Sequence, residues 1–128
     1  MIYGIGTDIV QIARMQTKIS RSGDNFAQEI LSAQEWDDYL NCKDTQKAAL
    51  LAKRFAAKEA LAKALRTGFR QPVFLNNISI LHNEHNAPYF ALSHDLQQWL
   101  NEKNIKNLHL SISDEKEYAI AFVVAEQS

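Results

Sequence analysis

Residues 45–66 read TQKAALLAKRFAAKEALAKALR, the strongest helical pattern in the sequence. Alanine and leucine dominate this stretch and both favour helix, so we predict one helix of about six turns that ends at Thr67 and Gly68. Its large apolar side chains share one broad arc, and small alanines cover most of the remaining surface. Because small side chains let neighbouring elements approach closely, we expect this helix to be central and largely buried.

Shorter segments with strand or helix patterns flank the central helix. Strands are expected over 2–10, 78–81, 88–92, 108–113 and 117–125, and further helices over 11–21, 25–31, 33–41 and 93–103. The third of these helices opens with Ser32 and Glu35 in a capping-box pattern. We therefore predict an α+β fold in which a mostly antiparallel sheet packs around one long central helix.

Composition indicates an ordinary globular protein in one domain, residues 1–128. The apolar content of 46% and charged content of 23% argue against intrinsic disorder. A single cysteine, Cys42, allows no internal disulfide and favours a reducing compartment, the cytoplasm. The N-terminus lacks the pattern of a signal peptide, and no apolar run has the length of a membrane span.

The formal net charge of −1 conceals an uneven distribution. Residues 43–70 carry eight basic and two acidic side chains, a net charge of +6, whereas residues 1–42 carry −3 and residues 84–128 carry −4. The whole-chain charge argues against bulk binding to nucleic acid. The basic middle segment instead indicates an anionic ligand.

Charged side chains interrupt the apolar arc of the central helix. Arg54 and Lys58 fall inside the arc, and Glu59 lies at its edge. Buried charges are costly unless they are paired or bound to a ligand. One interpretation is a set of internal salt bridges, for example between Glu59 and Lys63 four residues later; the other is a ligand site.

Asp8 is a second anomaly, because its neighbours in the first strand are apolar on both faces. It could bond to backbone amides or to an arginine, or it could pair with Glu59. Two carboxylates from a strand and a helix would suit Mg²⁺, and substrate phosphates and waters would complete its coordination shell. Arg54, Lys58 and Lys63 would then neutralise phosphate oxygens, so one magnesium–phosphate ligand would explain both anomalies.

Two weaker features involve polar and basic side chains. His109 shares the polar face of its strand with Ser111, where it could contact a phosphate, accept a proton or simply lie at the surface. Arg14, Lys18 and Arg21 form a basic stripe on the first predicted helix. That stripe is either a solvated face or a docking face for an acidic protein.

Three motifs in order resemble the holo-[acyl-carrier-protein] synthase family, the small bacterial type of 4′-phosphopantetheinyl transferase. They are GTDIV at 6–10, RFAAKEALAKA at 54–64, and HLSIS at 109–113 followed by EYA at 117–119. The resemblance covers essentially the full length. It implies the 4′-phosphopantetheinyl transferase fold and an enzyme of fatty acid biosynthesis. Such enzymes transfer the 4′-phosphopantetheine group of coenzyme A to a serine of apo acyl carrier protein and release adenosine 3′,5′-bisphosphate.

The resemblance also implies roles for individual residues. Mg²⁺ would be held by Asp8 and Glu59, which with Lys63 and His109 form the expected catalytic set. Coenzyme A would meet the residues Arg54, Lys58, Lys63, Arg66, Thr67, Gly68, His109 and Ser111. The acidic carrier protein would dock on Arg14, Lys18 and Arg21, and the protein would be a homotrimer with active sites between subunits. No nucleic acid or membrane partner is implied.

Several points stay open at the level of sequence. Arg66 stands where the family usually has glycine, which puts close backbone approach to the ligand in question. There are two alternatives to an enzyme. One is a relative that binds a nucleotide or a carrier protein without turnover, and the other is a structural trimer whose charges form internal salt bridges. The base that takes the serine proton is Glu59, a magnesium-bound water or His109.

Overall fold

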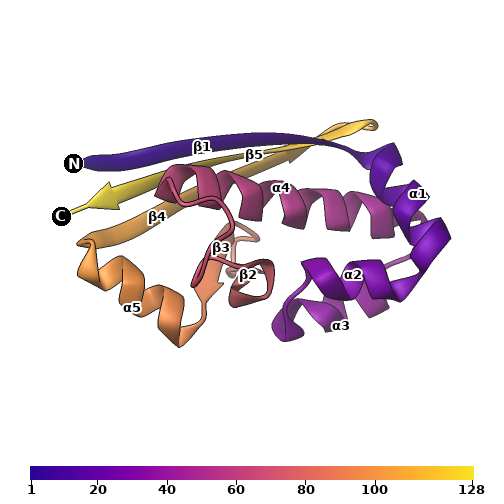
Figure 1. Ribbon diagram of the computed structural model, residues 1–128. Helices are drawn as coiled ribbons and strands as arrows, with labels where there is room; N and C mark the ends of the chain where they lie inside the picture. The colour runs from indigo at the N-terminus through magenta and orange to yellow at the C-terminus, as the bar shows by residue number, and fades with distance from the viewer.

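A helix of 19 residues, α4 (Lys47–Leu65), lies along one face of a three-stranded antiparallel sheet (Figure 1). The computed structural model describes residues 1–128. The sheet has the order β1-β5-β4, with β1 spanning Ile2–Gln11, β4 spanning Ile105–Asp114 and β5 spanning Tyr118–Gln127. Most residues of α4 are buried, which confirms the prediction of a central helix.

The remaining elements cover the other sides of α4. They are α1 (Ile12–Ser22), α2 (Asp24–Ile30), α3 (Ala33–Asn41), β2 (Ile78–His82), β3 (Pro88–Leu92) and α5 (His94–Glu102), with short 3₁₀ turns at Asp44–Gln46 and Leu75–Asn77. The first three helices gather at one end of α4, and α5 lies towards the other (Figure 1). The α+β class is confirmed, although β2 and β3 form a separate two-stranded sheet. None of the helices combines the length and apolar character that a membrane crossing requires.

Two glycines set the distance between β1 and α4. A Cβ atom added at Gly4 would lie 2.0 Å from the Ala64 carbonyl oxygen, and one at Gly6 would lie 1.9 Å from that of Ala60. Any side chain at either position would therefore clash with the helix backbone. Because β1 lies so close to α4, the next inward-facing residue of the strand, Asp8, is carried to the side of the helix.

The two faces of the three-stranded sheet differ sharply. Alternate residues of β5 that face α4 are almost fully buried, with Ala121 and Val123 at its centre. No helix or strand covers the outer face (Figure 1). Large apolar side chains lie exposed there: Ile5, Ile9, Ile120 and Phe122 are between 43% and 61% exposed. The period of two along each strand thus separates an inner core from an open apolar surface.

Candidate active site

The charged residues of α4 belong to two separate groups. Glu59 and Lys63 lie with Asp8 of β1, a set that we call the Asp8 cluster. Arg54 and Lys58 instead contact Glu35 of α3, and these three form the Glu35 cluster. Sequence reasoning placed all four helix residues around one ligand, so the separation is a finding of the structure.

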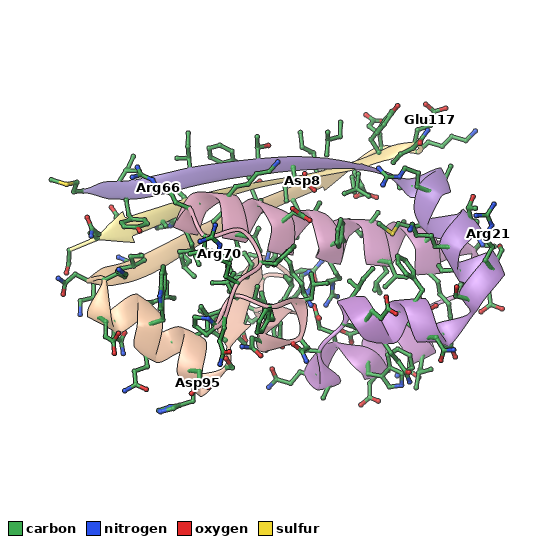
Figure 2. All side chains as sticks on the ribbon, in the orientation of Figure 1. Asp8, Arg21, Arg66, Arg70, Asp95 and Glu117 are labelled. Carbon is green, nitrogen blue, oxygen red and sulfur yellow. The ribbon has the colours of Figure 1, made fainter.

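In the Asp8 cluster the single lysine pairs with only one of the two carboxylates. Lys63 Nζ donates to Asp8 Oδ1 at 3.3 Å and to the backbone oxygen of Thr7 at 2.9 Å. That backbone oxygen is available because β1 is an edge strand of the sheet. The Asp8 side chain is 18% exposed and lies on the α4 side of β1 (Figure 2), whereas Lys63 is 54% exposed. A solvent-accessible ion pair therefore marks this edge of the sheet.

Glu59 is the under-satisfied member of the Asp8 cluster. It forms neither a hydrogen bond nor an ion pair, so the expected bridge between Glu59 and Lys63 is absent. Partial burial raises the pKa of Glu59; the Asp8 charge adds to the rise, and Lys63 opposes it. The Glu59 carboxylate thus keeps its acceptor positions free beside another negative charge, which is the arrangement that a cation would relieve.

The donor set of the Asp8 cluster restricts the kind of metal that fits. No three or more histidine, cysteine, aspartate or glutamate side chains converge anywhere in the chain. A metal that needs a complete cage of protein ligands is therefore a poor fit. Mg²⁺ binds through one or two carboxylates and completes its octahedron with waters and substrate phosphates, so Asp8 and Glu59 suit it.

In the Glu35 cluster, Glu35 and Lys58 are fully buried, and Arg54 is nearly so. Glu35 accepts four hydrogen bonds, as many as a carboxylate can take: from the Ser32 and Ile80 amides at 2.9 and 3.0 Å, from Arg54 at 3.2 Å and from Lys58 at 2.6 Å. The expected capping box between Ser32 and Glu35 is present. Sequence reasoning missed the larger role of Glu35, because a local capping pattern already explained the residue.

The position of Lys58 corrects the expectation that it meets a ligand phosphate. Its side chain is 0% exposed, and Nζ donates to Glu35 at 2.6 Å and to the backbone oxygens of Ile30 and Leu75 at 2.7 and 3.0 Å. These contacts use all three donors of the ammonium group. Burial lowers the pKa of Lys58, and the Glu35 charge counteracts that change. For Lys58 the structure matches the internal salt bridge that the sequence left open.

Arg54 links the Glu35 cluster to a basic cavity of about 190 Å³. Its lining includes Lys53, Arg54, His82, Asn86 and Asp114. Lys53 forms no ion pair. Burial lowers the pKa of His82, and the positive charges of Arg54 and Lys53 lower it further, whereas the negative charge of Asp38 opposes this change. Sequence reasoning missed Lys53 and His82, although the basic segment 43–70 already contained the first of them.

His109 and Ser111 lie on the opposite face of the sheet from Asp8. In the register of β1, β5 and β4, both side chains share the outer face with Ile5 and Phe122. His109 Nε2 lies 3.0 Å from Glu126 Oε1, and this hydrogen bond lowers the pKa of Glu126. Within one subunit, neither residue joins the Asp8 cluster.

The three basic residues of α1 remain exposed, as the helical pattern predicted. Met15 is buried on the opposite side of the helix. Lys18 Nζ lies 5.3 Å from the centre of the Phe26 ring, and Arg21 points away from the molecule (Figure 2). Because β1 leads directly into α1, the stripe begins six residues after Asp8, with Arg14.

A comparison with known families matches residues 4–123 to the 4′-phosphopantetheinyl transferase superfamily. The chain belongs to this superfamily. The holo-[acyl-carrier-protein] synthase of Nitrosomonas europaea is 46% identical over 127 residues, which are 99% of this chain and 100% of that protein.

Solved structures agree with this membership in the phosphopantetheinyl transferases. The holo-[acyl-carrier-protein] synthase of Neisseria meningitidis has a TM-score of 0.94 at 44% identity, covering 99% of this chain and 100% of that one. The holo-(acyl-carrier-protein) synthase of Bacillus anthracis was solved in complex with CoA (3′,5′-ADP). Its TM-score is 0.84 at 34% identity, and the match covers 100% of this chain and 99% of the Bacillus chain. The fold of this phosphopantetheinyl transferase is therefore that of its named relatives.

Arg66, the position at which the resemblance led us to expect glycine, lies at the end of α4. Arg66 has φ 64° and ψ 24°, the left-handed conformation that favours glycine. Its guanidinium carbon lies 5.3 Å from the centre of the Tyr3 ring, near the N-terminal end of β1 (Figure 2). Arg66 thus retains the backbone turn of a glycine, and Gly68 follows with φ 62°. Thr67 Oγ1 donates to the Gly68 carbonyl at 2.7 Å.

Proposed function

We propose that this chain transfers the 4′-phosphopantetheine group from coenzyme A to a serine of apo acyl carrier protein and releases adenosine 3′,5′-bisphosphate. The observation that carries the proposal is the Asp8 cluster, in which a lysine pairs with one carboxylate and leaves a second, Glu59, unpaired at an accessible edge of the fold. The match to named holo-[acyl-carrier-protein] synthases along the whole chain supports it. Fatty acid biosynthesis is the pathway that such a modified carrier protein serves.

Asp8 and Glu59 would hold Mg²⁺ together with the pyrophosphate of coenzyme A. The bound cation would stabilise the negative charge that develops on phosphate oxygens during transfer. Lys63 lies beside Asp8 with half of its side chain exposed, so it can turn to a phosphate oxygen and stabilise the same charge. Positioning and electrostatics then supply most of the catalysis, as is usual for phosphoryl transfer.

The basic cavity is the proposed site for the nucleotide end of coenzyme A. Arg54 and Lys53 would bind its phosphate, and His82 would add a hydrogen-bonding group in the lining. Arg66, Thr67 and Gly68 lie at the end of α4 that carries Lys63, where they can contact another part of the ligand. The serine oxygen would attack the β-phosphorus and displace the bridging pyrophosphate oxygen, which leaves as part of adenosine 3′,5′-bisphosphate. The serine proton would pass to a base, for which Glu59 and His109 are the candidates in this chain.

We propose a homotrimer that buries the open face of the three-stranded sheet. Ile5, Ile9, Ile120 and Phe122 form an apolar surface there, and exposed apolar patches of this kind mark interfaces between proteins. His109 and Ser111 share that face, so they could reach coenzyme A only at the site of a neighbouring subunit. This arrangement would place the active sites between subunits.

The exposed stripe Arg14, Lys18 and Arg21 is the proposed docking surface for the acidic carrier protein. Its position directly after β1 would bring the carrier serine towards Asp8. Complementary charge would mainly accelerate encounter and select the partner. We place the protein in the cytoplasm, since its single thiol, Cys42, suits a reducing compartment.

Mass spectrometry of the carrier protein tests the proposed function. The protein is mixed with coenzyme A, Mg²⁺ and apo acyl carrier protein, and the carrier is expected to gain the mass of phosphopantetheine. Chelation of the metal, or the substitution Glu59→Gln, should abolish the gain, whereas Glu29→Gln, an exposed glutamate without an ion pair, should not. An unmodified carrier in the complete mixture would contradict the proposal.

A further inference from the structure

Arg54 is held by three contacts, of which two are buried and one is open to water. Nη1 donates to Glu35 Oε2 at 3.2 Å and to the Ile80 carbonyl at 2.7 Å, both in the buried interior. Nη2 instead reaches Asp38 Oδ2 of α3 at 3.5 Å, the outer limit of a hydrogen bond. The Glu35 side chain is 0% exposed and the Asp38 side chain is 54% exposed, so only the contact with Asp38 is open to water.

The same guanidinium lines the basic cavity, where an anionic ligand would approach it. We infer that Asp38 competes with this ligand for Arg54 Nη2 and thereby weakens binding at the cavity. The inference rests on the proposed function, which places the nucleotide end of coenzyme A there. Arg54 need not move to bind the ligand, since Glu35 and Ile80 keep Nη1 in place while Nη2 exchanges its acceptor.

The energies of the two kinds of contact favour such an exchange. An exposed ion pair is worth little, so displacement of Asp38 costs little. A phosphate oxygen can make a shorter and stronger charge-assisted hydrogen bond to the same nitrogen. Asp38 still opposes the ligand after it is displaced, because salt only partly screens the repulsion between its negative charge and a nearby bound anion. Asp38 also acts on His82 in the cavity lining. Its negative charge partly offsets the lowering of the His82 pKa by burial and by Arg54.

Competition of this kind would matter most after transfer. The nucleotide product carries the same anionic groups as the nucleotide end of coenzyme A, so the cavity also has to release it. A nearby carboxylate that takes back Arg54 Nη2 would speed that release. Asp38 is therefore inferred to tune affinity, and it contributes no step of the chemistry.

Calorimetric titration with adenosine 3′,5′-bisphosphate in the presence of Mg²⁺ tests the inference. Asp38→Asn should lower the Kd by about two- to fivefold, because it removes the competing charge and keeps the side-chain shape. The matched control is Asp37→Asn, which makes the same charge change at the neighbouring exposed position, where no ion pair exists. The control should leave the Kd unchanged.

The outcomes separate this inference from the proposed function. Equal Kd values for the two variants would overturn the inference alone, as would weaker binding by Asp38→Asn, which would make Asp38 a support for Arg54. A merely structural role predicts that weaker binding and cannot produce a tighter one. No binding by the unsubstituted protein would overturn both the inference and the proposed use of the cavity.

Discussion

The Glu35 cluster and the Asp8 cluster each combine two charged side chains of α4 with a carboxylate from another element, yet their bonding differs. Lys58 and Glu59 are adjacent in sequence, and each belongs to a different cluster. In the Glu35 cluster one carboxylate accepts four hydrogen bonds and the lysine uses all its donors. In the Asp8 cluster the one lysine pairs with Asp8 alone, and Glu59 has no hydrogen-bond or ion-pair partner.

This difference distinguishes a structural charge cluster from a ligand site. A buried charge that is completely paired, as Glu35 and Lys58 are, joins elements, here α3, α4 and β2, and has nothing left to offer a ligand. A charge cluster with spare acceptors and a like-charged neighbour costs stability unless something binds it. We therefore assign a folding role to Glu35 and Lys58, and the proposed cation site remains the Asp8 cluster.

The largest effect is expected from Glu35→Gln. The amide would turn donors towards Lys58 and Arg54, leaving a buried ammonium without its counter-charge. Loss of one partner of a buried ion pair costs about 3–5 kcal/mol, so the free energy of unfolding in urea should fall by that amount. Glu29→Gln, the exposed control, should change it by less than about 0.5 kcal/mol. A comparably small loss in Glu35→Gln would remove the distinction between the clusters.

Gly6→Ala should act next most strongly, through the contact that brings Asp8 to α4. The new Cβ would lie 1.9 Å from the Ala60 carbonyl, so the strand and helix must separate. Overpacking typically costs about 1–3 kcal/mol, measurable as a lower free energy of unfolding. Carrier modification should fall as well, because Asp8 and Glu59 would move apart. Full activity in a stable Gly6→Ala protein would show that this close approach does not set the site.

The Asp8 cluster should leave a signature in the pH dependence of stability. The pKa of Glu59 is raised in the folded protein. Its contribution to the free energy of unfolding is therefore complete below the unfolded-state pKa of about 4.3 and is lost as pH rises through the folded-state pKa. With the metal chelated, Glu59→Gln should remove this decline without destabilising the protein at neutral pH. Urea unfolding across this pH range measures it. An unchanged decline in the variant would locate its cause elsewhere.

The smallest effect is expected from Arg66→Gly. Glycine would keep the left-handed conformation without its cost to an L-residue, about 1–2 kcal/mol. The substitution also removes the contact with Tyr3, worth about 0.5–1 kcal/mol. The net change in unfolding free energy should stay within about 1.5 kcal/mol and favour glycine. Tyr3→Ala in each background isolates the ring contact. A large loss of stability in Arg66→Gly would mean that the arginine side chain holds the turn.

Sequence reasoning identified Asp8 and Glu59 because each is a charge among apolar neighbours, a conflict visible in local pattern. It also predicted the elements that carry them, since periodicity and capping are local. It misjudged Lys58, whose partner Glu35 lies 23 residues earlier, on a separate helix. Pairing across elements depends on packing, which helical spacing does not encode. The same limit hid the link between Arg54 and Asp38.

A calorimetric titration of Mg²⁺ in the presence of coenzyme A tests the central claim most directly. The protein and its Glu29→Gln variant should bind Mg²⁺ with the same affinity, whereas Glu59→Gln and Asp8→Asn should remain folded and show little or no heat of binding. Retained binding in both folded variants would contradict the claim that the Asp8 cluster is the cation site.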